Sequence, residues 1–148
     1  MTLAVLSVAV PGLAQRQRAA VSALPAARVE VESARVDFGS SAAGDARKEL
    51  PSAIVVRVFS PRPWSLRLMP RAPLTEHERG QTVPWERVEW RTRTNPYQLV
   101  LPAGFVIARG GPTNSSGELV SVDLRIVFAS SDALGSFGGA LKIILDSW

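Results

Sequence analysis

The chain has 148 residues, of which 46% are hydrophobic and 20% charged, so its size and composition fit one globular domain with a substantial core. Its 17 Lys and Arg residues exceed its 13 Asp and Glu residues by a net charge of +4, but the two signs alternate along the chain, which argues against the basic stripe of a nucleic-acid-binding surface. The chain has no cysteine, which excludes disulfides and thiolate metal sites without excluding export.

Residues 2–14, TLAVLSVAVPGLA, form an uncharged apolar run that ends in Pro-Gly and a small residue, just before the polar stretch QRQR. This pattern is typical of a secretory signal peptide and predicts cleavage after Ala14, which makes residues 1–14 a leader and the mature chain secreted or bound at the cell surface. The run is too short to span a bilayer, so no membrane span is expected in the mature chain. No Lys or Arg precedes the run, which leaves two alternatives: a true start upstream of Met1, or an ordinary buried strand in place of a leader.

Residues 15–27, QRQRAAVSALPAA, precede the first clear strand and are expected to form a weak helix or an extended arm. Val21 and Leu24 are spaced apolar residues in this stretch. They are the side chains that we expect to insert into a neighbouring subunit if the arm is a donor strand. A disordered mature N-terminus is the alternative.

From residue 28 onward, apolar and polar residues alternate with the period of a β-strand. Strands are predicted at residues 28–32, 35–38, 52–59, 64–68, 85–91, 97–101, 105–108, 119–128 and 140–145. Short stretches rich in Gly, Pro and Asn separate them, and no helix of the kind that connects parallel strands intervenes. We therefore expect residues 28–148 to form an all-β domain, an antiparallel two-sheet immunoglobulin-like sandwich of seven to nine strands.

Trp64 shares one face of its predicted strand with Leu66 and Leu68, while Ser65 and Arg67 take the other face. A large aromatic residue in the middle of a sandwich is usually buried, with roughly 150–250 Å² of its surface removed from water. We predict that Trp64, Leu66 and Leu68 anchor the core.

The only histidine, His77, lies between Glu76 and Glu78 in a charged stretch. Three successive residues without a further ligand do not make a preorganised metal site, so a solvated loop is predicted. No second histidine is present to activate a serine, and no calcium-loop or phosphate-loop spacing occurs. The sequence therefore predicts no enzyme, no catalytic or metal-binding residues and no cofactor.

Trp85 and Trp90 differ in parity, so in one regular strand they point to opposite faces and at least one of them is expected to be exposed. With Arg91 and Arg93 they form the predicted ligand or partner surface, because aromatic faces and guanidinium groups suit sugars and acidic polymers. The alternative is an edge strand shielded by its loop. Trp148 is expected to be a tether or an interface residue.

Three short motifs follow one another along the chain: Val36-Asp37-Phe38-Gly39-Ser40, Trp64-Ser65-Leu66, and residues 135–145 with the sequence GSFGGALKIIL. In this order they resemble the WxL-type cell-surface domains of bacteria and the related immunoglobulin-like and pilin-like secreted sandwiches. The resemblance covers residues 28–145 in layout and implies an exported structural or adhesive domain. WxL domains carry a second Trp-x-Leu, whereas the equivalent strand here reads Val122-Asp123-Leu124-Arg125, so direct peptidoglycan binding is not implied.

Two functions follow from these observations. The first is an exported subunit of a bacterial surface appendage, fibre or matrix that forms a homo-oligomer or polymer by β-strand addition between subunits. The second is a cell-surface adhesive module that contacts glycan or cell-wall material through exposed Trp and Arg side chains.

Overall fold

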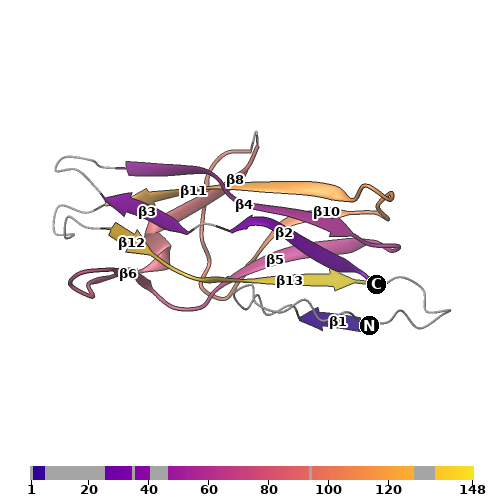
Figure 1. The fold of residues 1–148 in the computed structure, drawn as a ribbon, viewed down its shortest axis with the longest axis horizontal. Helices are drawn as coiled ribbons and strands as arrows, with labels where there is room; N and C mark the ends of the chain where they lie inside the picture. Colours follow the sequence, from indigo (N-terminus) through magenta and orange to yellow (C-terminus); the bar gives the residue numbers. More distant parts are fainter. Residues whose placement is uncertain (1, 6–25, 35, 41–46, 94, 129–135) are drawn as a thin grey trace.

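The computed structural model describes residues 2–5, 26–34, 36–40, 47–93, 95–128 and 136–148. In these residues the regular structure consists of thirteen strands and one 3-10 turn, η1 (Trp85–Arg87), with no α-helix (Figure 1). The strands are β1 (Thr2–Val5), β2 (Arg28–Ala34), β3 (Asp37–Ser40), β4 (Arg47–Phe59), β5 (Trp64–Pro70), β6 (Leu74–Glu76), β7 (Thr82–Val83), β8 (Val88–Thr92), β9 (Gln98–Leu99), β10 (Phe105–Gly110), β11 (Glu118–Val127), β12 (Ser136–Gly138) and β13 (Leu141–Ser147).

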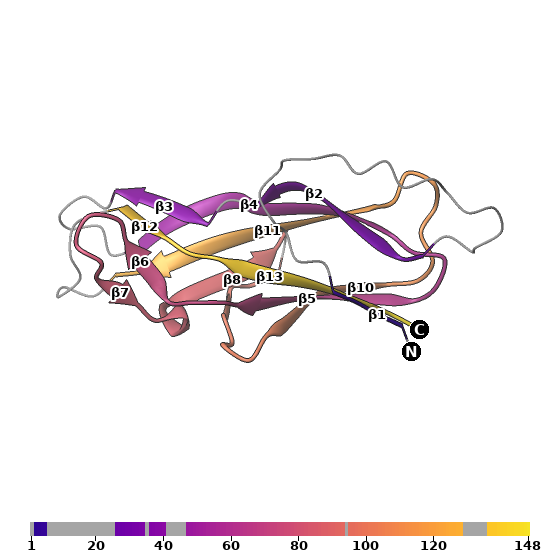
Figure 2. The same cartoon turned by 60° about the horizontal axis from the view of Figure 1, so that its bottom comes forward.

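The strands form three antiparallel sheets. Sheet A has the order β1-β13-β5-β10, sheet B the order β2-β4-β11-β8-β9, and sheet C the order β3-β12-β6-β7. Sheets A and B make the two layers of an elongated sandwich, and the short strands of sheet C lie at the end of the long axis opposite the two termini (Figures 1 and 2).

The core lies between the layers and is built from alternate residues of each strand. Strand β5 contributes three fully buried residues, which confirms the prediction that they belong to the core: Trp64, Leu66 and Leu68. The inward side chains of β11 complete the opposite wall: Val120, Val122, Leu124 and Ile126. A Cβ at Gly110 would lie 2.8 Å from Cζ2 of Trp64, so only glycine lets β10 approach this indole.

The prediction of an all-β antiparallel sandwich is confirmed at this level. The predicted strand count and the two-sheet layout are wrong, because a third sheet exists and more strands are present than seven to nine. Of the strands of sheet C, β6, β7 and β12 have two or three residues each, too few to show an alternating pattern in the sequence.

Strand β1 pairs with β13 at the edge of sheet A, with the register Thr2↔Ser147 to Val5↔Ile144. The beginning of the predicted leader is therefore placed as a strand, which corresponds to the second alternative for the apolar run. The predicted cleavage position at Ala14 lies outside the described residues. The described residues contain no helix long and apolar enough to cross a membrane.

Candidate functional site

The two tryptophans of the predicted ligand surface are both buried, so the expectation that at least one would be exposed is wrong. Trp85 lies in η1, is 4% exposed, and donates a hydrogen bond from its indole N–H to the carbonyl of Ala72. Trp90 lies on β8, is 6% exposed, and its ring centroid is 4.9 Å from that of Phe105. Because β8 begins only at Val88, the strand alternation does not extend back to Trp85, and neither indole is available to stack on a sugar.

Arg91 belongs to a network of charged side chains on the outer face of sheet B, the face opposite the core. Its Nε donates a hydrogen bond of 3.0 Å to Oδ2 of Asp123, and across the same strands Arg125 Nη2 lies 2.5 Å from Oε2 of Glu89. Both guanidinium groups contact the ring of Tyr97, with their central carbons 4.5 Å (Arg91) and 3.9 Å (Arg125) from its centroid. Cross-strand pairs of opposite charge stabilise a sheet face, and these link β8 and β11.

The electrostatics agree with this structural role. The hydrogen bond to Asp123 raises the pKa of Arg91, and burial raises the pKa of Tyr97 above its ordinary value. Arg91 is thus fully charged and committed to a partner within the protein. Arg93 differs from Arg91 because it is exposed and lies beyond the end of β8.

A bulge in β4 lies next to this network. The pairing of β4 with β11 shifts between Val122 and Leu124, and within the bulge Ser52 has a positive φ of 48°. The backbone N–H of Ser52 donates to Oδ1 of Asp123 at 2.8 Å, so one carboxylate holds both the bulge and Arg91. No pattern in the sequence predicts this contact between residues 71 positions apart.

The stretch around His77 is a hairpin turn rather than a wholly solvated loop. His77 and Glu78 are exposed, but Glu76 is only 1% exposed and accepts hydrogen bonds from the backbone N–H groups of Glu78, at 3.0 Å, and of Arg79. These two bonds lower the pKa of Glu76. The carboxylate therefore closes the turn between β6 and β7. In the part of the chain that the structure describes, no group of three or more His, Cys, Asp or Glu side chains is arranged to hold a metal.

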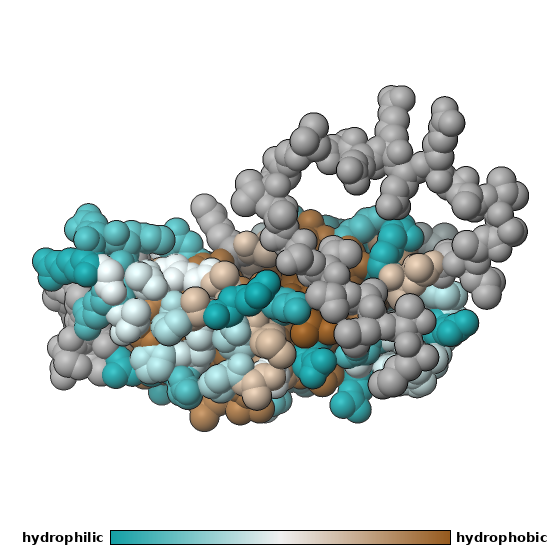
Figure 3. All heavy atoms as spheres, turned by 90° about the horizontal axis from the view of Figure 1, so that it is seen from below, coloured by the Kyte–Doolittle hydropathy of each residue, from teal (hydrophilic) through white to brown (hydrophobic). Residues whose placement is uncertain are grey.

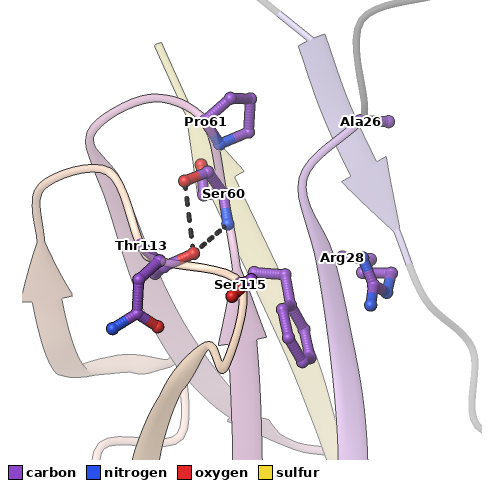
Figure 4. Close-up of a pocket in the computed structure, with 8 residues that line it drawn as sticks. Ala26, Arg28, Ser60, Pro61, Thr113 and Ser115 are labelled. Atoms are coloured by element: carbon purple, nitrogen blue, oxygen red, sulfur yellow. Dashed lines mark hydrogen bonds between the residues drawn. The ribbon is translucent and has the colours of Figure 1, made fainter.

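A hollow of about 240 Å³ lies at one end of the sandwich, where the β4–β5 and β10–β11 connections meet (Figure 4). The polar groups of Ser60 and Thr113 bond to each other across it, with Ser60 N–H donating to Thr113 Oγ1 at 2.9 Å and Thr113 N–H donating to Ser60 O at 2.8 Å. On the other side, the guanidinium of Arg28 covers the ring of Phe59 at 4.0 Å and pairs with Glu30 at 3.3 Å. The polar groups of Ser60, Thr113 and Arg28 at this hollow therefore already have partners within the protein.

The residues predicted to insert into a neighbour, Val21 and Leu24, lie outside the described residues. The clearest assembly feature in the described part is instead β13. It pairs with β5 without a bulge over seven residues, from Leu141↔Pro70 to Ser147↔Trp64, and on its other side it receives β1.

Strand β13 has core residues on one face and, on the other, a single apolar residue, Ile144, between the charged Lys142 and Asp146. Ile143 and Leu145 belong to the core, whereas Ile144, which alternation directs to the opposite face, lies outside the core cluster and is still only 6% exposed. In the view of Figure 3, hydrophobic residues show mainly near the middle, and the end formed by sheet C is mostly hydrophilic or neutral. The large hydrophobic side chains that the described structure leaves exposed do not belong to β13: Leu99, Leu101, Val106, Leu119 and Trp148. Strand β13 thus lies between two strands, and β1 occupies the side of β13 that would otherwise be an edge of sheet A.

No protein-family model matches the chain, and comparisons with curated proteins and with solved structures found no match. Function is therefore argued from the geometry described above.

Proposed function

We propose that this chain is an exported structural subunit of a bacterial surface appendage, fibre or matrix, and that its subunits join by strand addition at β13. The observation that carries the proposal is that β13 accepts an extended segment, Thr2–Val5, from a part of the chain far away in sequence. An edge that accepts such a strand from its own chain offers the same backbone hydrogen bonds to the equivalent strand of a neighbour.

The outer strands β2, β9 and β10 have features that block pairing with another chain, whereas β13, which would be an edge strand without β1, is regular along its length. The outer strand β2 carries Arg28, Glu30 and Glu32 and has a bulge, and the outer strand β10 also has a bulge. The edge strand β9 has only two residues. Charges, bulges and short strands are the usual means by which proteins block unwanted pairing at sheet edges. Strand β13 carries two charged residues, Lys142 and Asp146, but it is seven residues long and has no bulge, so its backbone groups can pair along the whole strand.

The chain between β1 and the rest of the domain is long enough to allow exchange of β1 between subunits. Residues 6–25 separate β1 from the next described residue, and twenty residues can span at most about 66–72 Å when fully extended. Reciprocal exchange gives a closed dimer, whereas exchange in one direction gives an open chain of subunits.

Cleavage of the predicted leader is compatible with the same mechanism. Removal of residues 1–14 would remove β1 and leave the edge of β13 open, and the predicted arm, residues 15–27 with Val21 and Leu24, would then be the donor. In that form, replacing Val21 and Leu24 with Asp is expected to abolish assembly and protease protection of the arm. Immunoglobulin-like topology and descent from WxL-type domains remain predictions from the three motifs.

The absence of cysteine allows a direct test by engineered cross-linking. Leu3 and Asp146 are register partners between β1 and β13, and partners in an antiparallel pair lie within the Cα distance that a disulfide needs. We expect the Leu3→Cys/Asp146→Cys variant, oxidised as an assembled sample, to form covalent dimers and higher multimers on a non-reducing gel. Negative-stain microscopy and light scattering of the unmodified chain should show fibres or sheets.

The matched control keeps the same cysteine on β13 and moves the other to β5. Ser65 is the register partner of Asp146 on that side, and this pair joins neighbouring strands of one subunit. The Ser65→Cys/Asp146→Cys variant should therefore remain a monomer on the gel. If the Leu3 variant also gives only internally linked monomers, and the chain scatters as a monomer at high concentration, strand exchange at β13 is refuted.

A further inference from the structure

Arg93 lies directly after β8, where two surface hollows meet. The larger, about 480 Å³, is lined by Ser52, Val55, Arg93, Leu119, Ser121 and Asp123. The smaller, about 190 Å³, shares Arg93, Leu119 and Ser121 with it and extends toward β10. Within the part of the chain that the structure describes, no carboxylate pairs with Arg93 and no hydrogen bond holds its side chain, in contrast to Arg91.

The backbone at this point has an uncommon conformation. Arg93 has a φ of 36°, in the left-handed region that non-glycine residues seldom occupy. The chain turns sharply here: the N–H of Asn95 donates to the carbonyl of Thr92 at 3.0 Å, and the Asn95 side-chain amide donates to Thr92 Oγ1 at 2.9 Å. The turn presents the guanidinium of Arg93 at the junction of the hollows. Backbone outliers of this kind often accompany binding sites.

We propose that the larger hollow binds a carboxylate-bearing sugar chain, with Arg93 as the group that recognises the carboxylate. The planar guanidinium matches a carboxylate with two parallel hydrogen bonds. The hydroxyls of Ser52 and Ser121, 3.1 Å apart, can bond to sugar hydroxyls. Val55 and Leu119, the latter 40% exposed, provide an apolar wall for the C–H face of a sugar ring.

Two acidic side chains at the site restrict the charge of the ligand. Asp123 lines the larger hollow and Glu118 the smaller one. The oxygens of Asp123 already accept from Ser52 N–H and Arg91 Nε, so its charge is partly compensated. The carboxylate of the ligand must therefore lie at Arg93, with neutral sugar hydroxyls facing Asp123 and Glu118, because a carboxylate placed against either acidic side chain would be repelled. The volume lies within the range of about 300–1,000 Å³ that is common for small-molecule sites.

The inference is independent of strand addition, because the hollow lies on sheet B and β13 lies in sheet A. The test is an NMR titration of the ¹⁵N-labelled full chain with trigalacturonate, using the neutral galactose trisaccharide and sodium acetate as comparison probes. We expect trigalacturonate to shift the amides of Ser52, Arg93 and Ser121 in a saturable manner, with at least tenfold higher affinity than either comparison probe.

The variant Arg93→Gln should weaken trigalacturonate binding at least tenfold, and Ser121→Ala about threefold, by loss of one hydrogen bond. The control Arg62→Gln removes the same charge from an exposed arginine in the β4–β5 turn and should leave the affinity unchanged. Thermal unfolding by circular dichroism verifies that each variant is folded. Equal binding of the neutral trisaccharide, equal binding of acetate, unchanged affinity in Arg93→Gln, or a Kd above about 10 mM would each overturn the proposal.

Discussion

Two buried tryptophans differ in one hydrogen bond and are otherwise closely matched. Trp64 is 0% and Trp85 4% exposed, but the indole N–H of Trp64 has no hydrogen-bond partner, whereas that of Trp85 donates to Ala72 O. Cζ2 of each ring lies against a glycine: a Cβ at Gly110 or at Gly139 would lie 2.8 Å from the neighbouring Cζ2. Replacement by Phe therefore removes similar volume at both sites, and the cavity terms largely cancel in a comparison.

The remaining difference is the N–H. Trp85→Phe removes the hydrogen bond to the carbonyl of Ala72. Because Ala72 is exposed, water can replace the lost donor, so the loss should be only about 1 kcal/mol. Trp64→Phe removes a buried, unsatisfied donor whose burial costs about 1–3 kcal/mol. We expect Trp85→Phe to be the more destabilising by about 2 kcal/mol or more, which corresponds to a difference of roughly 4–8 °C in Tm for a domain of this size.

Urea unfolding followed by far-ultraviolet circular dichroism measures both variants without relying on tryptophan fluorescence. Trp90→Phe gives an internal check, since the indole N–H of Trp90 is also buried without a partner, and it should behave like Trp64→Phe. If Trp64→Phe loses as much free energy of unfolding as Trp85→Phe, the unpaired N–H carries no net cost and the reasoning is wrong.

Three further outcomes are expected. Gly110→Ala should lose about 1–3 kcal/mol of unfolding free energy in urea because its methyl group would clash with an indole ring, whereas Gly111→Ala, with nothing within 4 Å, should change by less than about 0.5 kcal/mol. The pKa of Glu76 is lower in the folded chain than in the unfolded chain, where it is about 4.5. The ionised carboxyl therefore stabilises the fold at a pH above about 4.5, and this contribution is lost as the pH falls through the pKa of the folded state. The urea midpoint should therefore fall less between pH 6 and pH 3 in Glu76→Gln than in the unmodified chain; an equal fall would contradict this. Asp123→Ala should lose about 1–3 kcal/mol of unfolding free energy in urea, because it leaves the N–H of Ser52 and the guanidinium of Arg91 without their acceptor. Asp146→Ala, whose ion pair with Arg67 is 3.7 Å long with side chains 37% and 30% exposed, should lose under about 1 kcal/mol; equal losses would contradict this role of Asp123.

The proposed site depends on contacts that no local pattern reveals. Arg91 and Arg93 are two residues apart, yet one is bound to Asp123 and the other has no partner in the described residues. The difference arises because β8 ends at Thr92 and the chain turns. Ser52 lines the same hollow from a bulge in β4, where β4 has more residues than β11 between two successive paired positions.

Strands with one face buried over five or more residues can be recognised from the sequence alone, because alternate apolar residues then form a clear period of two. This holds for β5, with the buried face of Trp64, for β11 and for residues 54–58 of β4. It does not hold for residues 47–51 of β4, which the sequence does not predict as a strand, or for β13, whose buried residues Ile143, Ile144 and Leu145 are consecutive. Only the tertiary structure decided the burial of Trp85, because the 3-10 turn before β8 breaks the alternation on which the prediction relied. The tertiary structure also decided the existence of sheet C and the partner of each edge, because strands of two or three residues are stabilised by their neighbours rather than by their own sequence.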